Sequence, residues 1–139
     1  MNAAFPRTFF ALNGLAAFVH DRCVSEGVDA DAEQALQFAV EEIFTNMVKY
    51  GRGGEKTIAI AMVRDHATVR VVITDRGADP FDITRHPPAD VTRPIEERTP
   101  GGLGLHLTRR MMDEVRYEYR ESDRCTIITL VKRLETDHV

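Results

Sequence analysis

Apolar residues recur at helical spacing in two stretches near the start of the chain. The first stretch, residues 9–23, carries a single apolar stripe made of Leu12, Leu15, Ala16, Val19 and Cys23. Gly27 interrupts this pattern, and Asp29 or Asp31 then offers a side-chain cap for a second helix. The second helix is expected to run to about Tyr50, with a core side formed by Leu36, Ala39, Val40, Ile43 and Met47.

Further along the chain the apolar period changes from helix to strand. Apolar residues alternate with smaller or polar ones, as in half-buried strands, in four stretches: 58–62, 69–73, 115–119 and 125–134. The first two are joined by RDHA, which predicts a hairpin, and a third helix is predicted between the second and third. It covers 102–113, with Leu103, Leu107 and Met111 in line. Because hairpins dominate, we expect an α+β fold whose largely antiparallel sheet is covered by helices on one face.

One long segment follows neither period. Residues 76–100 contain five prolines and many charges. An irregular connection of this length is unusual in a small domain and is typical of a lid or a binding loop.

Composition and charge narrow the class of protein. The 139 residues suffice for one domain, and the 43% apolar content is globular. Pro6 and Arg7 interrupt any signal-peptide core, and no apolar run has membrane-spanning length, so we expect a cytoplasmic protein without a membrane partner. The net charge of −4 argues against direct binding to nucleic acid. Cys23 and Cys125 are expected to be reduced and buried, and no zinc-binding spacing occurs.

The second predicted helix carries polar residues on an otherwise apolar surface. In FAVEEIFTNMVKYG, the residues Phe38, Glu42, Asn46 and Lys49 share one face. A carboxylate, an amide and an ammonium group at this spacing can hold a hydrated Mg²⁺ ion and phosphates. The alternative is a solvated helix face with a weak side-chain pair.

Two further segments break the pattern around them. In ITDRGADPFD, Asp75 ends a strand and can accept a hydrogen bond from an exocyclic amine, while Gly77 allows a positive φ or a close approach to a flat ring. In PGGLGLHLTR, glycines precede or begin a helix whose N-terminal amides favour a phosphate. The alternatives are an ordinary turn and a flexible hinge.

Taken together in this order, the three segments resemble the Bergerat-type ATP-binding fold of the GHKL superfamily. EIFTN is similar to its N box, DRG at 75–77 to its first glycine box, and GGLGL at 101–105 to its second. The resemblance covers roughly residues 6–134. It implies a single domain over 1–139, built as a two-layer α/β sandwich with a mixed, mainly antiparallel sheet and an ATP lid at about 78–100.

Within the superfamily, the chain resembles the anti-sigma-factor serine kinases of bacterial partner-switching systems. The similarity rests on EIFTN, DRGADPFD, and GGLGLHLTRRMMDEV followed by YEY. It implies a kinase that uses ATP and Mg²⁺ to phosphorylate a serine on an anti-anti-sigma (STAS-type) partner and otherwise sequesters a sigma factor. It also implies a homodimer whose contact involves residues 6–23, including Phe9 and Phe10.

The resemblance assigns roles to individual residues. Glu42 would be the general base for the acceptor serine, Asn46 would ligate Mg²⁺, and Lys49 would touch a phosphate. Asp75 would bond the adenine amine, and Gly77 would pack against the base. Further contacts to the nucleotide would come from Thr126, which binds adenine through water, and from the second glycine box, Gly101, Gly102, Leu103, Gly104 and Leu105, with the amides of its central three residues on phosphate oxygens.

Two departures from the family pattern leave other functions open. Cys125 stands where the family often has Gly, and Tyr50 where it often has His. We expect altered nucleotide packing rather than lost binding. One alternative is a non-catalytic, ATP-responsive module that binds partners in a sigma-factor switch. The other is an ATP-binding accessory domain of a histidine-kinase or phosphatase system.

Overall fold

The computed structural model describes residues 2–51, 54–78 and 102–134. These residues form five strands, one 3-10 turn and three α-helices. In chain order they are β1 (Asn2–Pro6), η1 (Phe9–Ala11), α1 (Leu12–Ser25), α2 (Ala30–Tyr50), β2 (Thr57–Asp65), β3 (Thr68–Arg76), α3 (Gly102–Met111), β4 (Glu114–Arg120) and β5 (Cys125–Arg133).

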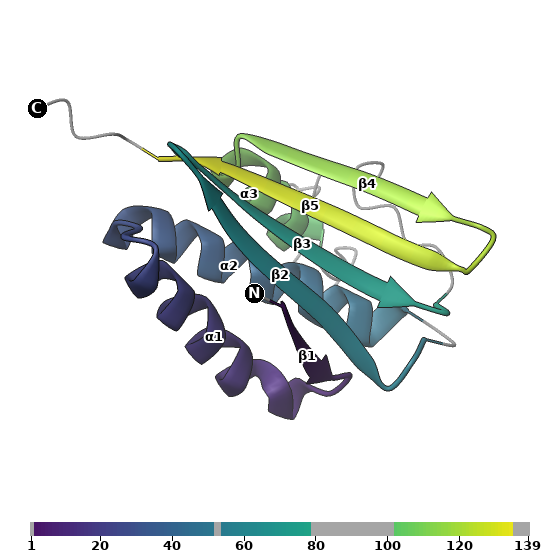
Figure 1. The fold of residues 1–139 in the computed structure, drawn as a ribbon. Helices are drawn as coiled ribbons and strands as arrows, with labels where there is room; N and C mark the ends of the chain where they lie inside the picture. The colour runs from purple at the N-terminus through teal and green to yellow at the C-terminus, as the bar shows by residue number, and fades with distance from the viewer. Residues whose placement is uncertain (1, 52–53, 79–101, 135–139) are drawn as a thin grey trace, which may run out of the picture.

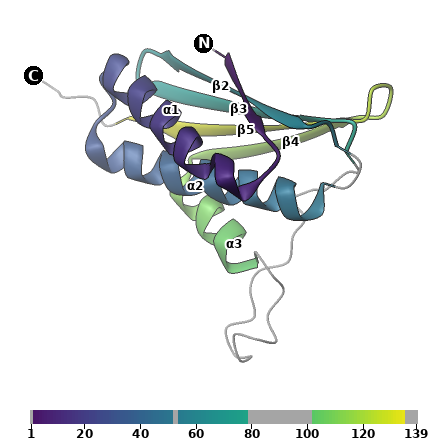
Figure 2. The ribbon, with the colours of Figure 1, turned by 90° about the horizontal axis from the view of Figure 1, so that it is seen from below.

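The strands form one sheet with the order β1-β2-β3-β5-β4 (Figure 1). All four pairings between described strands are antiparallel, although the expected sheet was mixed. Figure 2 shows α1, α2 and α3 on the same face of this sheet. The predicted two-layer α+β architecture is confirmed.

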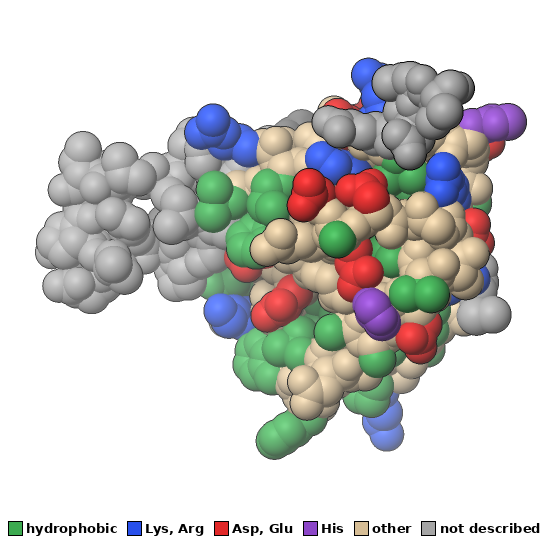
Figure 3. All heavy atoms as spheres, turned by 90° about the vertical axis from the view of Figure 1, so that its left-hand side faces the viewer, with side chains coloured by type: hydrophobic (Ala, Val, Ile, Leu, Met, Phe, Trp, Pro, Cys, Tyr) green, Lys and Arg blue, Asp and Glu red, His purple; other side chains and the backbone are tan. Residues whose placement is uncertain are grey.

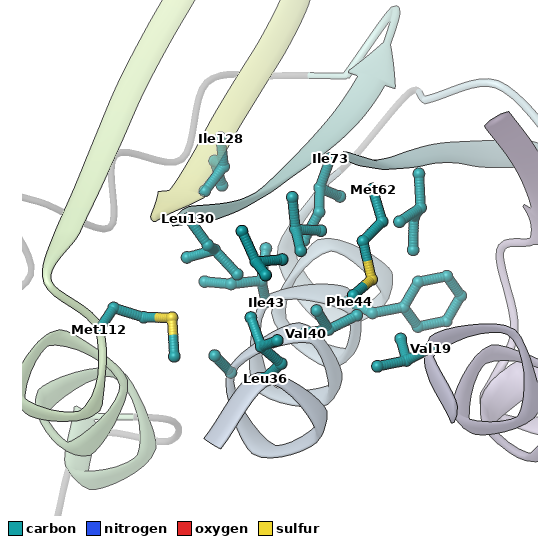
Figure 4. Packing of buried hydrophobic residues seen from close by; sticks show 14 of the residues in the cluster. Val19, Leu36, Val40, Ile43, Phe44, Met62, Ile73, Met112, Ile128 and Leu130 are labelled. Atoms are coloured by element: carbon teal, nitrogen blue, oxygen red, sulfur yellow. The ribbon is translucent and has the colours of Figure 1, made fainter. Parts of the chain in front are cut away.

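The core lies between the sheet and the helices, and α2 runs through its centre (Figure 4). The apolar side of α2, with Leu36, Val40 and Ile43, faces every second residue of the central strands, such as Ile73. Other fully buried strand side chains are Ile58, Ile60, Met62, Ile128 and Leu130. Each such side chain contributes about 1.5–3 kcal/mol by leaving water. Because the buried residues of α2 lie along its whole length, the helix fixes where the backbone of each polar residue on it lies relative to the sheet.

The ends of α2 agree with the sequence. Asp29 is the N-cap, since its carboxylate accepts from Ala32 N at 3.2 Å, and Asp31 lies within the first turn. Gly27 adopts a φ of 68°, which explains the break before the helix. The helix ends at Tyr50, as predicted.

One strand was missed in the sequence analysis, and one residue was assigned to the wrong face of a helix. Strand β1 was not predicted, because its five residues have no strand pattern of their own and gain their hydrogen bonds from β2. On α3, Leu107 was expected in the apolar line but is 39% exposed, whereas the neighbouring Thr108 is fully buried. The chain turns the small polar residue inward there.

Other sequence expectations have mixed outcomes. Both cysteines are buried and free, as predicted, and burial raises the pKa of Cys23 to about 11. No helix in the described part of the chain is long and apolar enough to cross a membrane. The expected lid lies outside the described residues, except for the buried Ala78.

Candidate functional site

Glu42 and Asn46 form a hydrogen-bonded pair on α2. Asn46 is only 2% exposed, and its Nδ2 donates to the Glu42 carbonyl oxygen at 2.6 Å and to Glu42 Oε1 at 3.1 Å. Both donations use the amide nitrogen, so they fix which way the amide points. Asn46 Oδ1 is buried and has no partner within residues 2–51, 54–78 and 102–134.

The Asn46 side-chain oxygen is suited to act as a metal ligand. A buried carbonyl oxygen without a hydrogen bond costs about 1–3 kcal/mol, so it calls for an explanation. Mg²⁺ prefers hard oxygen ligands and takes few of them from protein, with water and phosphate completing its shell. The oriented Oδ1 atom therefore suits a hydrated Mg²⁺ ion that binds together with phosphates.

Asp75 and Thr126 lie directly opposite each other on β3 and β5. Opposite residues of antiparallel strands point to the same face, with Cβ atoms about 4.5–5.5 Å apart. Both side chains are buried, at 2% and 4% exposure, and Thr126 Oγ1 has no partner in the part of the chain that the structure describes. The fold thus brings together two polar groups that are far apart in the sequence. Both could then contact the same polar edge of one ligand.

Gly77 follows Asp75 in a conformation that side chains rarely adopt. Its φ is 76°, and its amide donates to the Arg124 carbonyl oxygen at 2.7 Å. The expectation of a positive φ is confirmed. The turn carries the chain away from β3 immediately after the buried carboxylate.

Arg7 completes the surroundings of Asp75 and was not identified from the sequence. Its guanidinium contacts both carboxylate oxygens, through Nη2 to Oδ1 and through Nη1 to Oδ2 at 3.2 Å. Burial raises the pKa of Asp75, and the hydrogen bonds and charge of Arg7 oppose that rise. No local pattern marked Arg7, because its partner lies 68 residues away.

The other predicted site residues are Lys49 and the second glycine box. Lys49 is exposed in the last turn of α2, one turn beyond Asn46. Gly102, Leu103, Gly104 and Leu105 lie in the first turn of α3, a helix that packs against α2, so the glycines do begin a helix. Gly101 lies outside the described residues.

A surface pocket of about 340 Å³ lies away from these residues, at the beginning of α2. It is lined by Asp29, Asp31, Ala32, Asp113, Lys132, Arg133 and Leu134. Figure 3 shows acidic side chains gathered near the centre of the face on that side of the molecule, with basic ones around its edge. The mixed charge and the distance along α2 separate this hollow from the Asn46 and Asp75 groups.

Comparison with known sequences defines the class. A sequence model of the histidine kinase-like ATPase domain matches residues 5–132. The chain belongs to this family, and its expected membership is confirmed.

Within that class, the chain is similar to serine-protein kinases named RsbW. The relative from Halalkalibacterium halodurans is 31% identical over 119 residues, which cover 81% of this chain and 70% of the relative. The Bacillus subtilis protein is 28% identical, with 80% and 79% covered, and that of Listeria monocytogenes is 37% identical, with 68% and 64% covered. These relatives confirm the predicted enzyme class, an ATP-dependent protein serine kinase.

Solved structures share the fold. A Mycobacterium tuberculosis structure of RsbU and RsbW domains matches with a TM-score of 0.66 and 19% identity, covering 99% of this chain and 33% of that one. The chain thus spans about a third of that protein. The SiaB–SiaC complex from Pseudomonas aeruginosa matches with a TM-score of 0.58 and 13% identity, covering 95% and 88%.

Proposed function

We propose that this chain is a single ATP-binding domain that phosphorylates a serine of an anti-anti-sigma (STAS-type) protein and otherwise sequesters a sigma factor. The observation that carries the proposal is the hydrogen-bonded Glu42–Asn46 pair, in which Asn46 is buried, its Oδ1 has no partner among the described residues, and the Glu42 carboxylate lies beside it. The RsbW relatives, which are serine-protein kinases, support the same activity.

In phosphoryl transfer, the two residues of the pair would have different roles, one as metal ligand and one as general base. Asn46 Oδ1 would ligate Mg²⁺, which on binding supplies positive charge to the phosphates. Glu42 would accept the proton of the acceptor serine while the serine oxygen bonds to the γ-phosphorus and the bond to the ADP oxygen breaks. A positioned base of this kind contributes about 10²–10⁴-fold in rate.

The opposite end of the site would hold the nucleotide. Asp75 would accept a hydrogen bond from the adenine amine, with Thr126 binding the same edge through water and Gly77 against the ring. Lys49 would contact a phosphate. The amides at the start of α3, with Gly101 and Leu105 at the borders of the motif, would bind phosphate oxygens.

A homodimer is proposed through the N-terminal elements. Strand β1 is at the edge of the sheet, so its outer side pairs with no other described strand. Next to it, Phe10 is 96% exposed and Phe9 is 49% exposed. Edge strands and exposed aromatic side chains are the features that proteins usually cover, and a second copy would cover both.

The catalytic role is tested with Glu42→Gln, which keeps the size of the side chain and removes its basicity. We expect transfer from labelled ATP to STAS-domain proteins of the same genome to fall by about 10²-fold or more, with ATP affinity by calorimetry within about threefold of wild type. Glu41→Gln, on the exposed side of the same helix, is the matched control and should retain transfer.

Two results would contradict the assignment. Wild-type transfer by Glu42→Gln would exclude Glu42 as the base. ATP binding without any transfer by the wild-type protein would favour the non-catalytic partner-binding module.

A further inference from the structure

Arg7 uses its whole guanidinium group in one place. Besides the two contacts to Asp75, Nε donates to the Glu55 carbonyl oxygen at 2.8 Å, and Nη1 donates to those of Met47 at 3.1 Å and Gly51 at 3.3 Å. The Arg7 side chain is 14% exposed. It therefore links the end of α2 and the segment before β2 to the C-terminal end of β3 through hydrogen bonds.

The surrounding backbone is shaped to admit this side chain. A Cβ atom at Gly54 would overlap Arg7 Nη2, so a larger residue there would push the guanidinium away. The Arg7 amide also donates to the Lys56 carbonyl oxygen at 2.8 Å, which continues the β1–β2 pairing by one residue. The arginine is thus fixed at both its backbone and its side chain.

A forked contact of this kind leaves the carboxylate able to bind something else. Each carboxylate oxygen has two acceptor positions, and the guanidinium occupies one on each oxygen. When Asp75 is ionised, all of its remaining positions are acceptors, and they form charge-assisted hydrogen bonds. A protonated Asp75 would carry a hydroxyl donor on one oxygen, so it would offer an amine fewer and weaker acceptor positions.

Burial works against that ionised state. It raises the pKa of Asp75, and the charge of Glu55 adds to the rise, whereas Arg7 lowers the pKa by hydrogen bonding and by its charge. Among the charged groups of the described residues, Arg7 is the one that favours the ionised carboxylate. An arginine stays protonated throughout the physiological range, so its effect does not change with pH.

We propose that Arg7 is a positioning residue for adenine recognition, holding Asp75 oriented and ionised so that it accepts the 6-amino group. The inference rests on the proposed nucleotide site. It predicts that Arg7 acts on the amine contact and not on the nucleotide as a whole.

The test compares two nucleotides across pH by calorimetry with Mg²⁺. For Arg7→Gln we expect ATP affinity about tenfold below wild type at pH 8. The ratio of wild-type to variant affinity should widen as pH falls, because loss of Arg7 raises the pKa of Asp75 further and the carboxyl is then protonated at a higher pH in the variant than in wild type. Purine riboside triphosphate lacks the 6-amino group, so its affinity should differ little between variant and wild type at every pH.

Two variants separate this role from general stabilisation. Arg7→Lys retains the charge without the fork and should show intermediate ATP affinity with a weaker pH dependence. Arg64→Gln is the matched control, because Arg64 also holds backbone carbonyl oxygens, those of Glu26 and Gly27, but at the far end of α2. It should leave the affinity of both nucleotides unchanged.

Each other outcome overturns the inference or the function beneath it. Tighter ATP binding in Arg7→Gln would mean that Arg7 competes with the nucleotide. Equal losses for both nucleotides would mean that Arg7 supports only the local fold. If wild type binds no ATP, or Asp75→Asn binds it normally, the proposed site itself is wrong.

Discussion

At the scale of single residues, the proposed site contains two buried polar atoms that have no partner among the described residues. They are Asn46 Oδ1 and Thr126 Oγ1, and both residues were singled out from the sequence. Two further atoms of this kind lie elsewhere, Thr108 Oγ1 on α3 and Arg22 Nε on α1, at positions that the sequence did not mark. Buried groups of this kind cost stability, so those with a ligand to bind have a reason to persist.

Thr126 can be tested separately from the strand that carries it. Thr126→Val keeps the shape and removes an unpaired hydroxyl, so the free energy of unfolding should stay level or rise by about 1 kcal/mol. ATP affinity should fall by about tenfold if the hydroxyl binds adenine through water. Urea unfolding and calorimetry measure the two quantities. Thr129→Val, on the other face of β5, should leave ATP affinity unchanged, and a destabilised Thr126→Val with normal ATP affinity would show a structural role instead.

The sequence analysis identified some of the site residues and missed Arg7. Glu42, Asn46 and Asp75 stand out because each is polar within an apolar pattern. Arg7 follows a proline in a segment with no period, and only the pairing of β1 with β2 brings it to Asp75. A contact that depends on such distant pairing leaves no trace in local spacing.

At the scale of elements, α2 serves both the core and the site. One side of the helix carries Leu36, Val40 and Ile43, and the next positions round the helix carry Glu42 and Asn46. Its period and caps were readable from the sequence because helical signals are local. β1 was not readable, since five residues at a sheet edge depend on their neighbour.

The N-cap of α2 gives a prediction for this element. Asp29→Ala removes the acceptor for Ala32 N and should lower the free energy of unfolding by about 0.5–2 kcal/mol in urea titrations. ATP affinity should be unchanged, because 21 residues of helix, about 30 Å, separate the cap from the Asp75 end. Asp31→Ala removes only a charge near the helix terminus, so its smaller loss should disappear at high salt. Equal losses at high salt would contradict the capping assignment.

At the scale of the whole molecule, one sheet carries a proposed ligand site and a proposed dimer surface. The site lies at the ends of β3 and β5 in the middle of the sheet, whereas β1 lies at its border. The layered arrangement followed from the order of helices and hairpins. The sheet order did not, because hydrophobic alternation does not say which strands are neighbours.

The dimer surface is tested by changing its most exposed aromatic residue. Phe10→Ser should convert the protein from dimer to monomer in sedimentation experiments while leaving its circular dichroism spectrum unchanged, because a side chain that is 96% exposed contributes little to the monomer core. Val24→Ser, at 66% exposure on α1, is the control and should remain dimeric. A wild-type protein that stays monomeric at high concentration would end the dimer proposal.

The short pairing between β1 and β2 also has a consequence for fluctuations. A five-residue strand at a sheet border is the part of such a fold that opens most readily, with a free energy well below that of global unfolding. Each opening withdraws the arginine that follows it from the buried carboxylate. By thermodynamic linkage, a nucleotide that needs this contact must slow the opening. Hydrogen exchange at the backbone amides of Ala3 and Phe5 would therefore report on a ligand bound two strands away.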